Sequence, residues 1–241
     1  MGRAISRLAA LIGLLAGAGA APAAGFVALD GGGATPQPPW HVAGLPAQKK
    51  PYTRFVLESL DGVRVLRIDA DRSYGHLVQA LPALQPAGHL AWRWRVDVPN
   101  GAADLRRKSA DDRAVEVCAL FDLPLDKLSF VDRQLLRVAR ALTSEPLPSA
   151  SVCYVWDQRV PADTMIDDAF TRRVRMIVLR GEGSVAGVWT AERRDLAADF
   201  LRLFGDETRE VPPLVGIGVS GDADNTQLHT LAFIADLVLE P

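Results

Sequence analysis

The apolar positions of this chain recur mainly in short runs in which apolar and polar side chains alternate. The clearest run is HLAWRWRVDV at residues 89–98. Trp92 and Trp94 fall on one side of this predicted strand, because side chains alternate between faces along an extended chain. Arg93 and Arg95 fall on the other side. Ten such runs occupy residues 54–59, 63–68, 76–81, 89–98, 113–122, 151–157, 173–180, 185–193, 214–220 and 231–239. Turn residues separate them, a spacing typical of an all-β, jelly-roll-like two-sheet β-sandwich.

Two short helices are predicted in the connections between strands. Ser129 and Asp132 form a weak capping pattern before the first, in which the apolar residues Val131, Leu135, Val138 and Leu142 share one face. The second runs over residues 195–204. Its residues Leu196, Phe200 and Leu203 are expected to face inward, and Gly205 is placed to end the helix.

The first 24 residues have the build of a secretory signal peptide. Arg3 and Arg7 precede an apolar run over residues 8–18, and small residues follow up to Ala24. The run is shorter than the about 20 residues that span a bilayer, so we expect cleavage rather than anchoring. Residues 25–51 are rich in Gly and Pro and predict a flexible lead-in that docks through Trp40. Residues 52–241 are left for the β-sandwich domain.

Charge and export together narrow the classes of partner. Without Arg3 and Arg7 the chain keeps 25 basic and 29 acidic residues, a net charge of −4. A mildly acidic chain is a poor general binder of nucleic acid or of an anionic membrane. No second long apolar stretch follows the signal, so we expect no membrane span after cleavage and a periplasmic or secreted location.

Cys118 and Cys153 are the only cysteines, and both lie in predicted strands. In an exported chain they can pair, and a loop of this length, 35 residues, would then stabilise the fold by roughly 4 kcal/mol in the chain-entropy model. Two separate buried thiols are the alternative, because pairing depends on geometry that sequence does not show.

A cluster of oxygen-bearing residues follows the strand predicted at 214–220. Asp222, Asp224 and Asn225 could converge on a structural Ca²⁺, because calcium needs several hard oxygen ligands. The alternative is a turn whose side chains satisfy the local backbone. The preceding GIGVSG at 216–221 matches a dinucleotide-binding spelling, but a turn rather than a helix follows it, so we expect no nucleotide cofactor.

Neighbouring acidic residues on loops are the candidates for catalysis. Asp111 and Asp112 follow Lys108 directly before a predicted strand, and this trio would serve if the protein is an enzyme. Asp167 and Asp168 form a second pair. Consecutive residues on an extended chain usually point apart, so solvated loop charge is the simpler interpretation of both pairs.

Arginines and aromatic residues are the candidates for ligand binding. Guanidinium groups suit the carboxylate or sulfate groups of an acidic polymer, and aromatic rings could stack on sugars. These groups would form one lattice only if their strands are neighbours; the alternatives are a solvated face of ion pairs and ordinary core packing. The candidates are Arg93, Arg95, Glu116, Tyr154, Trp156, Arg173, Arg175 and Trp189.

Several ordered segments carry a family resemblance over residues 40–240. They are LAWRWRVDVP, KSADDRAVEVCALFD, LPSASVCYVWD, RRVRMIVLRGE, WTAERRDLAADFLRLFGDE and GIGVSGDADNT followed by AFIADLVLE. Together they resemble an exported bacterial family catalogued as a domain of unknown function. The last segment also resembles the closing strand of jelly-roll carbohydrate-binding modules. The resemblance implies an envelope location and supplies no functional residue.

From these observations we expect an exported, non-catalytic binding domain for carbohydrate or another polar or anionic polymer. A polysaccharide lyase or hydrolase of the envelope, using Lys108, Asp111 and Asp112, is the first alternative. An envelope structural or partner-binding protein is the second. No cofactor is expected apart from the structural Ca²⁺ considered above.

Overall fold

The computed structural model describes residue 23 and residues 25–45, 48–143 and 145–241. The predicted signal peptide therefore lies outside the described residues, apart from Ala23. Within the described ranges, no helix is long and apolar enough to cross a membrane.

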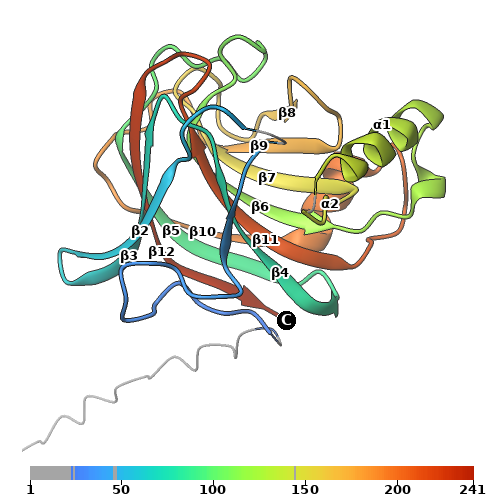
Figure 1. Ribbon diagram of the computed structural model, residues 1–241, viewed down its shortest axis with the longest axis horizontal. Coiled ribbons are helices and arrows are strands. Elements are labelled where there is room, and N and C mark those ends of the chain that lie inside the picture. The colour runs from blue at the N-terminus through green and yellow to red at the C-terminus, as the bar shows by residue number, and fades with distance from the viewer. Residues whose placement is uncertain (1–22, 24, 46–47, 144) are drawn as a thin grey trace, which may run out of the picture.

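The described residues form two sheets that pack face to face (Figure 1). The strands are β1 (His41–Ala43), β2 (Arg54–Leu60), β3 (Val63–Asp71), β4 (His76–Gln85), β5 (His89–Val98), β6 (Arg113–Phe121), β7 (Ala150–Trp156), β8 (Met165–Asp167), β9 (Val174–Arg180), β10 (Thr190–Asp195), β11 (Leu214–Asp222) and β12 (His229–Glu240). A seven-stranded sheet has the order β1-β4-β11-β6-β7-β9-β8, and a five-stranded sheet has the order β10-β5-β12-β3-β2.

The chain crosses repeatedly between the two sheets, as in a jelly roll. It passes from β3 to β4, returns to β5, and crosses again to β6. Neighbouring strands are antiparallel except β7 and β9, which are parallel. This arrangement confirms the predicted jelly-roll-like sandwich.

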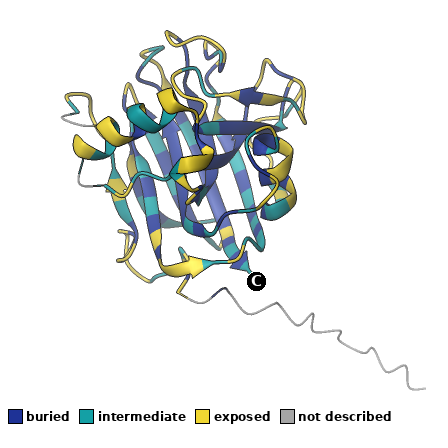
Figure 2. Cartoon of the chain, turned by 90° about the vertical axis from the view of Figure 1, so that its right-hand side faces the viewer, coloured by how far each residue is buried: buried dark blue, intermediate teal, exposed yellow. Residues whose placement is uncertain are grey.

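Alternation along β5 places the largest side chains in the core, as predicted. Trp92 and Trp94 are buried with their rings edge to face at 5.5 Å, and Tyr154 of β7 meets Trp92 from the opposite sheet at 5.3 Å. Burying one large apolar side chain stabilises a fold by about 1.5–3 kcal/mol. Figure 2 shows this buried interior between more exposed loops and helices. The sheets approach closely at Gly221, where an added Cβ would lie 2.8 Å from Ile68 Cγ2.

Three short helical elements lie in the connections, namely η1 (Leu125–Lys127), α1 (Phe130–Ala141) and α2 (Leu196–Phe204). Ser129 caps α1, since its Oγ accepts the amide of Asp132 at 3.1 Å. Asp195 caps α2 in the same way, and the apolar face of α2 is buried as predicted. The apolar face of α1 points to solvent instead, because Leu136 on the opposite side is the residue that packs into the core.

The Gly- and Pro-rich lead-in packs onto the sandwich instead of extending freely. Trp40 docks as predicted, because its ring is buried and its Nε1 donates to the carbonyl of Val27 at 2.7 Å. Phe26 packs edge-on against this ring at 6.1 Å. The lead-in also adds β1 to the seven-stranded sheet, a strand that the alternating pattern did not predict.

Cys118 and Cys153 face each other across β6 and β7 and form a disulfide. Their side chains lie on the outer face of the seven-stranded sheet, in a small second apolar cluster with Met176 and Val178. The disulfide therefore links two central strands directly.

We expect loss of this disulfide to lower the free energy of unfolding by roughly 3–4 kcal/mol, because the unfolded chain regains the freedom of a long loop. Urea unfolding of the wild type with and without reductant measures the effect. A Cys118→Ala/Cys153→Ala variant is the control, since reductant should not change its midpoint. Equal wild-type midpoints in both conditions would contradict the expectation.

Candidate functional site

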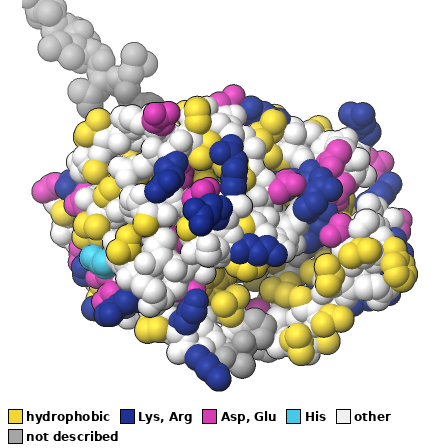
Figure 3. All heavy atoms as spheres, turned by 90° about the horizontal axis from the view of Figure 1, so that it is seen from above, with side chains coloured by type: hydrophobic (Ala, Val, Ile, Leu, Met, Phe, Trp, Pro, Cys, Tyr) yellow, Lys and Arg dark blue, Asp and Glu magenta, His cyan; other side chains and the backbone are white. Residues whose placement is uncertain are grey.

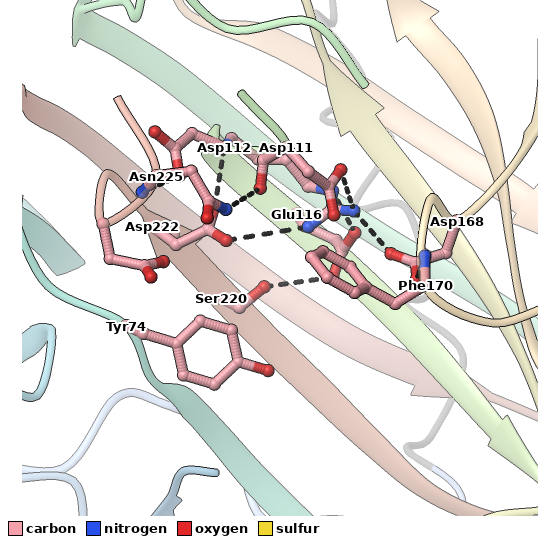
Figure 4. Close-up of polar contacts among 12 residues, drawn as sticks. Tyr74, Asp111, Asp112, Glu116, Asp168, Phe170, Ser220, Asp222 and Asn225 are labelled. Atoms are coloured by element: carbon pink, nitrogen blue, oxygen red, sulfur yellow. Dashed lines mark hydrogen bonds and ion pairs between the residues drawn. The ribbon is translucent and has the colours of Figure 1, made fainter. Parts of the chain in front are cut away.

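A buried arginine gathers four carboxylates where β6 begins. We call Arg113, Asp111, Glu116, Asp168 and Asp222 the Arg113 cluster (Figure 4). The Nη2 of Arg113 lies 2.9 Å from an oxygen of Asp111 and 2.9 Å from one of Asp168. Its Nε lies 3.1 Å from Glu116, and the backbone amide of Arg113 donates to Asp222 at 2.6 Å. One side chain thus connects β6, β11 and the loop after β8.

The acidic groups of the cluster outnumber its single guanidinium, and this shifts their protonation. Burial raises the pKa of Asp111 to about 6, although Arg113 opposes the shift. Burial likewise raises the pKa of Asp222 well above its ordinary range. Burial alone would lower the pKa of Arg113, but Glu116 and the other carboxylates raise it well above its ordinary value. Burial therefore makes Asp111 and Asp222 easier to protonate than exposed carboxyl groups.

Asp112 has a different role, because it holds the turn between β11 and β12. Its carboxylate accepts the backbone amides of Asn225 at 3.0 Å and Thr226 at 2.7 Å. The hydroxyl of Thr226 and the side-chain amide of Asn100 also donate to it. Four donors on one buried carboxylate fix the position of this turn.

Further polar groups lie beside Glu116 on the outer face of the seven-stranded sheet; Ser220 is buried, and Tyr74 and His76 are half-buried. Ser220 donates its hydroxyl to Glu116 at 3.0 Å, and the hydroxyl of Tyr74 lies 2.7 Å from Nε2 of His76. Burial lowers the pKa of His76 and raises that of Tyr74, so both stay neutral at pH 7. The cavity that borders Arg113 and Asp112 holds about 10 Å³, which is room for one water. The Arg113 cluster is therefore a closed polar core.

An open hollow adjoins this closed core, on the side of the β11–β12 turn. It has a volume of about 920 Å³. We call it the Tyr52 hollow, and its lining residues are Lys50, Pro51, Tyr52, Arg54, Asp69, Asp71, Arg72, Ser73, Gln227 and His229. They come from the lead-in, from β2 and β3 with the connection after β3, and from the turn that Asp112 holds and the start of β12.

Tyr52 is held in place with half of its surface exposed to solvent. An added Cβ on Gly44 would lie 2.5 Å from Cε1 of the ring, so glycine lets the chain pass directly against it. A Cβ on Gly75 would lie 3.6 Å from Cδ1, the neighbouring atom of the ring. Gln48 secures the loop, because its side-chain amide donates to the carbonyls of Lys50, Pro51 and Tyr74.

The charges around the Tyr52 hollow are mostly paired with one another. His229 lies 2.9 Å from Asp69, and Arg72 lies 3.0 Å from Asp71. Lys50 contacts Asp224, which connects the hollow to the turn below it. The rim therefore offers many donors and acceptors with little net charge.

The three candidate catalytic residues do not converge on an open site. Lys108 lies over the ring of Phe170, with its ammonium 5.3 Å from the ring centroid. Asp111 faces Arg113, and Asp112 faces the turn. Consecutive acids on an extended chain point apart, which is the simpler of the two interpretations given above.

The predicted arginine lattice does not form, because its strands belong to different sheets. Arg93 and Arg95 lie on the outer face of β5, where they pair with Asp236 and Asp97. Trp189 lies under Arg93, 5.5 Å from its guanidinium. This face is a solvated surface of ion pairs.

Five of the candidate ligand residues are buried, which corrects their expected exposure. Arg173 and Arg175 both pair with Glu207, and Arg175 also packs over Phe204. Tyr154 donates its hydroxyl to Asp199 in the core at 2.8 Å. Trp156 and Glu116 are buried as well. Strands covered on both faces conceal both sets of alternating side chains, and alternation alone does not reveal that cover.

Of the three predicted metal ligands, Asp222 and Asp224 converge. The third residue at this place is Asp112, which the sequence analysis considered only as a catalytic candidate. Oxygens of Asp112, Asp222 and Asp224 lie within 4.8 Å of one another. Asn225 instead donates its side-chain amide to the carbonyl of Asp111 at 3.1 Å. Each carboxylate already faces a donor or a cation, because Asp112 receives the turn amides, Asp222 the amide of Arg113, and Asp224 the ammonium of Lys50. Calcium binding stays a prediction, and the turn alternative accounts for these contacts.

A chelator experiment distinguishes a calcium site from the turn. Because protein donors already satisfy these oxygens, we expect the same melting midpoint in EGTA and in millimolar Ca²⁺. Differential scanning calorimetry measures it. A midpoint raised by Ca²⁺ in the wild type and not in Asp224→Asn would show that the metal is needed.

The pH dependence of stability tests the protonation of Asp111. Its folded pKa of about 6 lies above its ordinary value of 3.8, so its contribution to stability is complete at low pH. That contribution is lost as the pH rises through about 6. Asp111→Asn cannot titrate. We therefore expect the free energy of unfolding of the wild type, relative to this variant, to fall by on the order of 1–3 kcal/mol between acidic and neutral pH.

The difference between the two proteins is the quantity to measure, by urea unfolding at several pH values. Because the pKa of His76 is lowered, its titration makes the protein more stable as the pH rises, over a pH range that overlaps that of Asp111. This contribution is the same in the wild type and in Asp111→Asn, so it cancels in the difference. A difference that is independent of pH would mean that Asp111 titrates normally.

Comparison with known proteins finds distant structural matches and a family model. No curated protein matches the chain. Solved structures that match include endoglucanase 3 from Trichoderma harzianum, of family GH12, at 8% identity and a TM-score of 0.40. This match covers 84% of this chain and 97% of the other. Endoglucanase cel12A from Rhodothermus marinus matches at 10% identity and a TM-score of 0.39, over 82% and 94% of the two chains. At such identities the similarity concerns the arrangement of strands alone.

A family model described as "Protein of unknown function (DUF3047)" matches residues 38–238. The match covers the end of the lead-in and the sandwich as far as Val238 in β12, in agreement with the resemblance found in the sequence. The chain therefore belongs to the DUF3047 family.

Proposed function

We propose that this protein is a non-catalytic carbohydrate-binding domain and that the Tyr52 hollow is its binding site. The observation that carries the proposal is a half-exposed tyrosine ring, with Gly44 and Gly75 close to one edge of it, on the wall of an open polar hollow of about 920 Å³. A volume of that order accommodates a ligand of several rings. The apolar face of a sugar ring can pack on the aromatic ring while its hydroxyls meet the polar rim.

The polar groups of the rim suit hydroxyl groups better than they suit an anionic polymer. Asp69 and Asp71 offer acceptors, and Arg72, Gln227 and His229 offer donors or mixed groups. Because the acids and bases are largely paired, neither sign of charge dominates. A neutral or weakly charged glycan therefore fits this rim, and the sequence expectation narrows from polar or anionic polymers to neutral ones.

Rigid support from the closed core favours binding in the hollow. Asp112 fixes the turn that contributes Gln227, and Lys50 connects the rim to Asp224. A preformed site loses less conformational entropy when it binds a ligand than a mobile one does. Asp111 and Asp112, the acids considered for a lyase or hydrolase, instead contact Arg113 and the β11–β12 turn.

Export to the periplasm or the medium is part of the same proposal. The first 24 residues have the pattern of a signal peptide, and a disulfide between central strands suits an oxidising compartment. Polysaccharides of the envelope or the surroundings would be accessible there.

Glycan binding by Tyr52 variants tests the proposal. We expect the protein to bind at least one neutral polysaccharide in an array that also contains uronate polymers. Tyr52→Ala should weaken that binding about tenfold, since an aromatic contact contributes about 1 kcal/mol beyond the area it buries. Isothermal titration calorimetry gives the affinities.

Two variants act as controls for that measurement. Tyr52→Phe keeps the ring and should keep the affinity. Phe170→Ala removes another exposed aromatic ring, which lies outside the hollow, and should change nothing. The proposal fails if micromolar protein binds no glycan, or if Tyr52→Ala binds as tightly as the wild type.

A further inference from the structure

The disulfide between β6 and β7 lies beside a buried carboxylate. Cys118 and Cys153 are directly opposite each other in the register of the two strands, on the outer face of the seven-stranded sheet. Glu116 shares this face, because it precedes Cys118 by two residues along β6. Its Oε1 lies 3.2 Å from the sulfur of Cys118. The two sulfurs and a carboxylate oxygen of Glu116 all lie within 4.8 Å of one another, so three ligand atoms converge in one small volume.

The disulfide leaves Glu116 with unused capacity to bind a partner. A sulfur in a disulfide carries no hydrogen, so of the neighbours of Oε1 it is Ser220 that donates, at 3.0 Å. The other oxygen, Oε2, is buried and accepts no hydrogen bond from any described residue. It lies 3.1 Å from Nε of Arg113, but this nitrogen donates to the sulfur of Met176 at 3.4 Å. A carboxylate that is only 2% exposed and not fully satisfied can still bind a cation.

We propose that reduction of the disulfide converts Cys118, Cys153 and Glu116, which we call the sulfur site, into a binding site for one Zn²⁺ ion. Two thiolate sulfurs and a carboxylate oxygen are ligands that zinc prefers. A dithiol of the thioredoxin class supplies two electrons and two protons to the disulfide and is itself oxidised to a disulfide. Zn²⁺ then displaces the two thiol protons. This inference does not depend on the Tyr52 hollow.

The structure of the sheet keeps the sulfur site together after reduction. Strands β6 and β7 pair from Glu116 to Phe121, so their hydrogen bonds hold the two cysteines side by side without the disulfide. The sulfurs must separate to share one metal, and rotation about the Cα–Cβ bonds allows this. Cys118 is 6% exposed and Cys153 is 1% exposed. The reductant therefore reaches the sulfur of Cys118 more easily.

The charge balance of the sulfur site suits a divalent cation. Two protons leave as Zn²⁺ enters, so the net charge of this region does not change. Binding therefore adds no further charge to the neighbouring Arg113 cluster, in which carboxylates already outnumber the guanidinium. Calcium would not be bound in this way, because it takes six to eight oxygen ligands and sulfur does not suit it.

Cobalt absorption tests the sulfur site, because Co²⁺ can replace Zn²⁺ and reports thiolate ligands. Wild-type protein that is reduced with a phosphine, without oxygen, should bind one Co²⁺ per chain. This binding should give a thiolate-to-cobalt charge-transfer band in the near ultraviolet, which an equivalent of Zn²⁺ should remove. The oxidised protein should show no such band. Circular dichroism checks that the reduced protein stays folded.

Three variants assign the ligands. Cys118→Ala/Cys153→Ala should give no charge-transfer band. Glu116→Gln should keep the band and weaken Zn²⁺ binding at least about tenfold. Asp224→Asn is the matched control, because Asp224 belongs to the other converging group of possible ligands, and it should leave the band and the affinity unchanged. On the face that Figure 3 shows, acidic side chains are dispersed among basic ones, so we expect them to compete weakly for the cation.

Thermal unfolding in the presence of reductant gives a second readout. Zn²⁺ should raise the melting midpoint of the wild type, because it binds the folded state, and should not raise that of Cys118→Ala/Cys153→Ala. The proposal is overturned if the reduced, folded wild type gives no charge-transfer band, if Zn²⁺ leaves its midpoint unchanged, or if Glu116→Gln binds Zn²⁺ as tightly. Unfolding on reduction alone would overturn it as well, because the folded sheet holds the ligands together.

Discussion

The charge of Arg113, buried among carboxylates, is the constraint on which this end of the sandwich depends. Removing a guanidinium from water is costly unless opposite charges and hydrogen bonds surround it. Here Asp111 and Glu116 meet that requirement from positions close to Arg113 in the chain, whereas Asp168 and Asp222 come from a loop and a strand that are distant in sequence. The same requirement fixes where those loops run. A buried ion pair is weak support for stability as such, but it can select one arrangement of loops over others.

The closed core and the open hollow have complementary roles. Around Arg113 the polar groups are satisfied by one another and leave room for about one water. Around Tyr52 the polar groups are paired at the rim, and the ring remains half exposed. The turn between β11 and β12 joins the two regions, because Asp112 holds it from below while Gln227 lines the hollow above. The acidic loop residues of the DUF3047 chain thus support the turn that lines the Tyr52 hollow, the site that we propose for binding, and α1 presents a separate apolar face.

The sequence predicted what depends on local periodicity and missed what depends on distant segments. Alternation along β5 placed Trp92 and Trp94 in the core, and the helical spacing of Val131, Leu135, Val138 and Leu142 showed that they share one face of α1. Periodicity shows that side chains share a face and does not show what that face meets, so the outward direction of α1 was not predictable. The Tyr52 hollow combines the lead-in, the end of β3 and the β11–β12 turn. Its only local signal was an aromatic residue after Lys49, Lys50 and Pro51, in a segment interpreted as a lead-in and a domain start.

Hydrogen exchange at the β11–β12 turn tests most directly whether the Arg113 cluster shapes the hollow. The amides of Asn225 and Thr226 donate to Asp112, the residue that precedes Arg113 in the chain. Arg113→Met removes the charge and keeps much of the side chain's volume. The account predicts that these two amides then exchange at least about tenfold faster, while amides of β5 and β12 far from the turn keep their protection. Unchanged exchange at Asn225 and Thr226 in a folded Arg113→Met protein would contradict it.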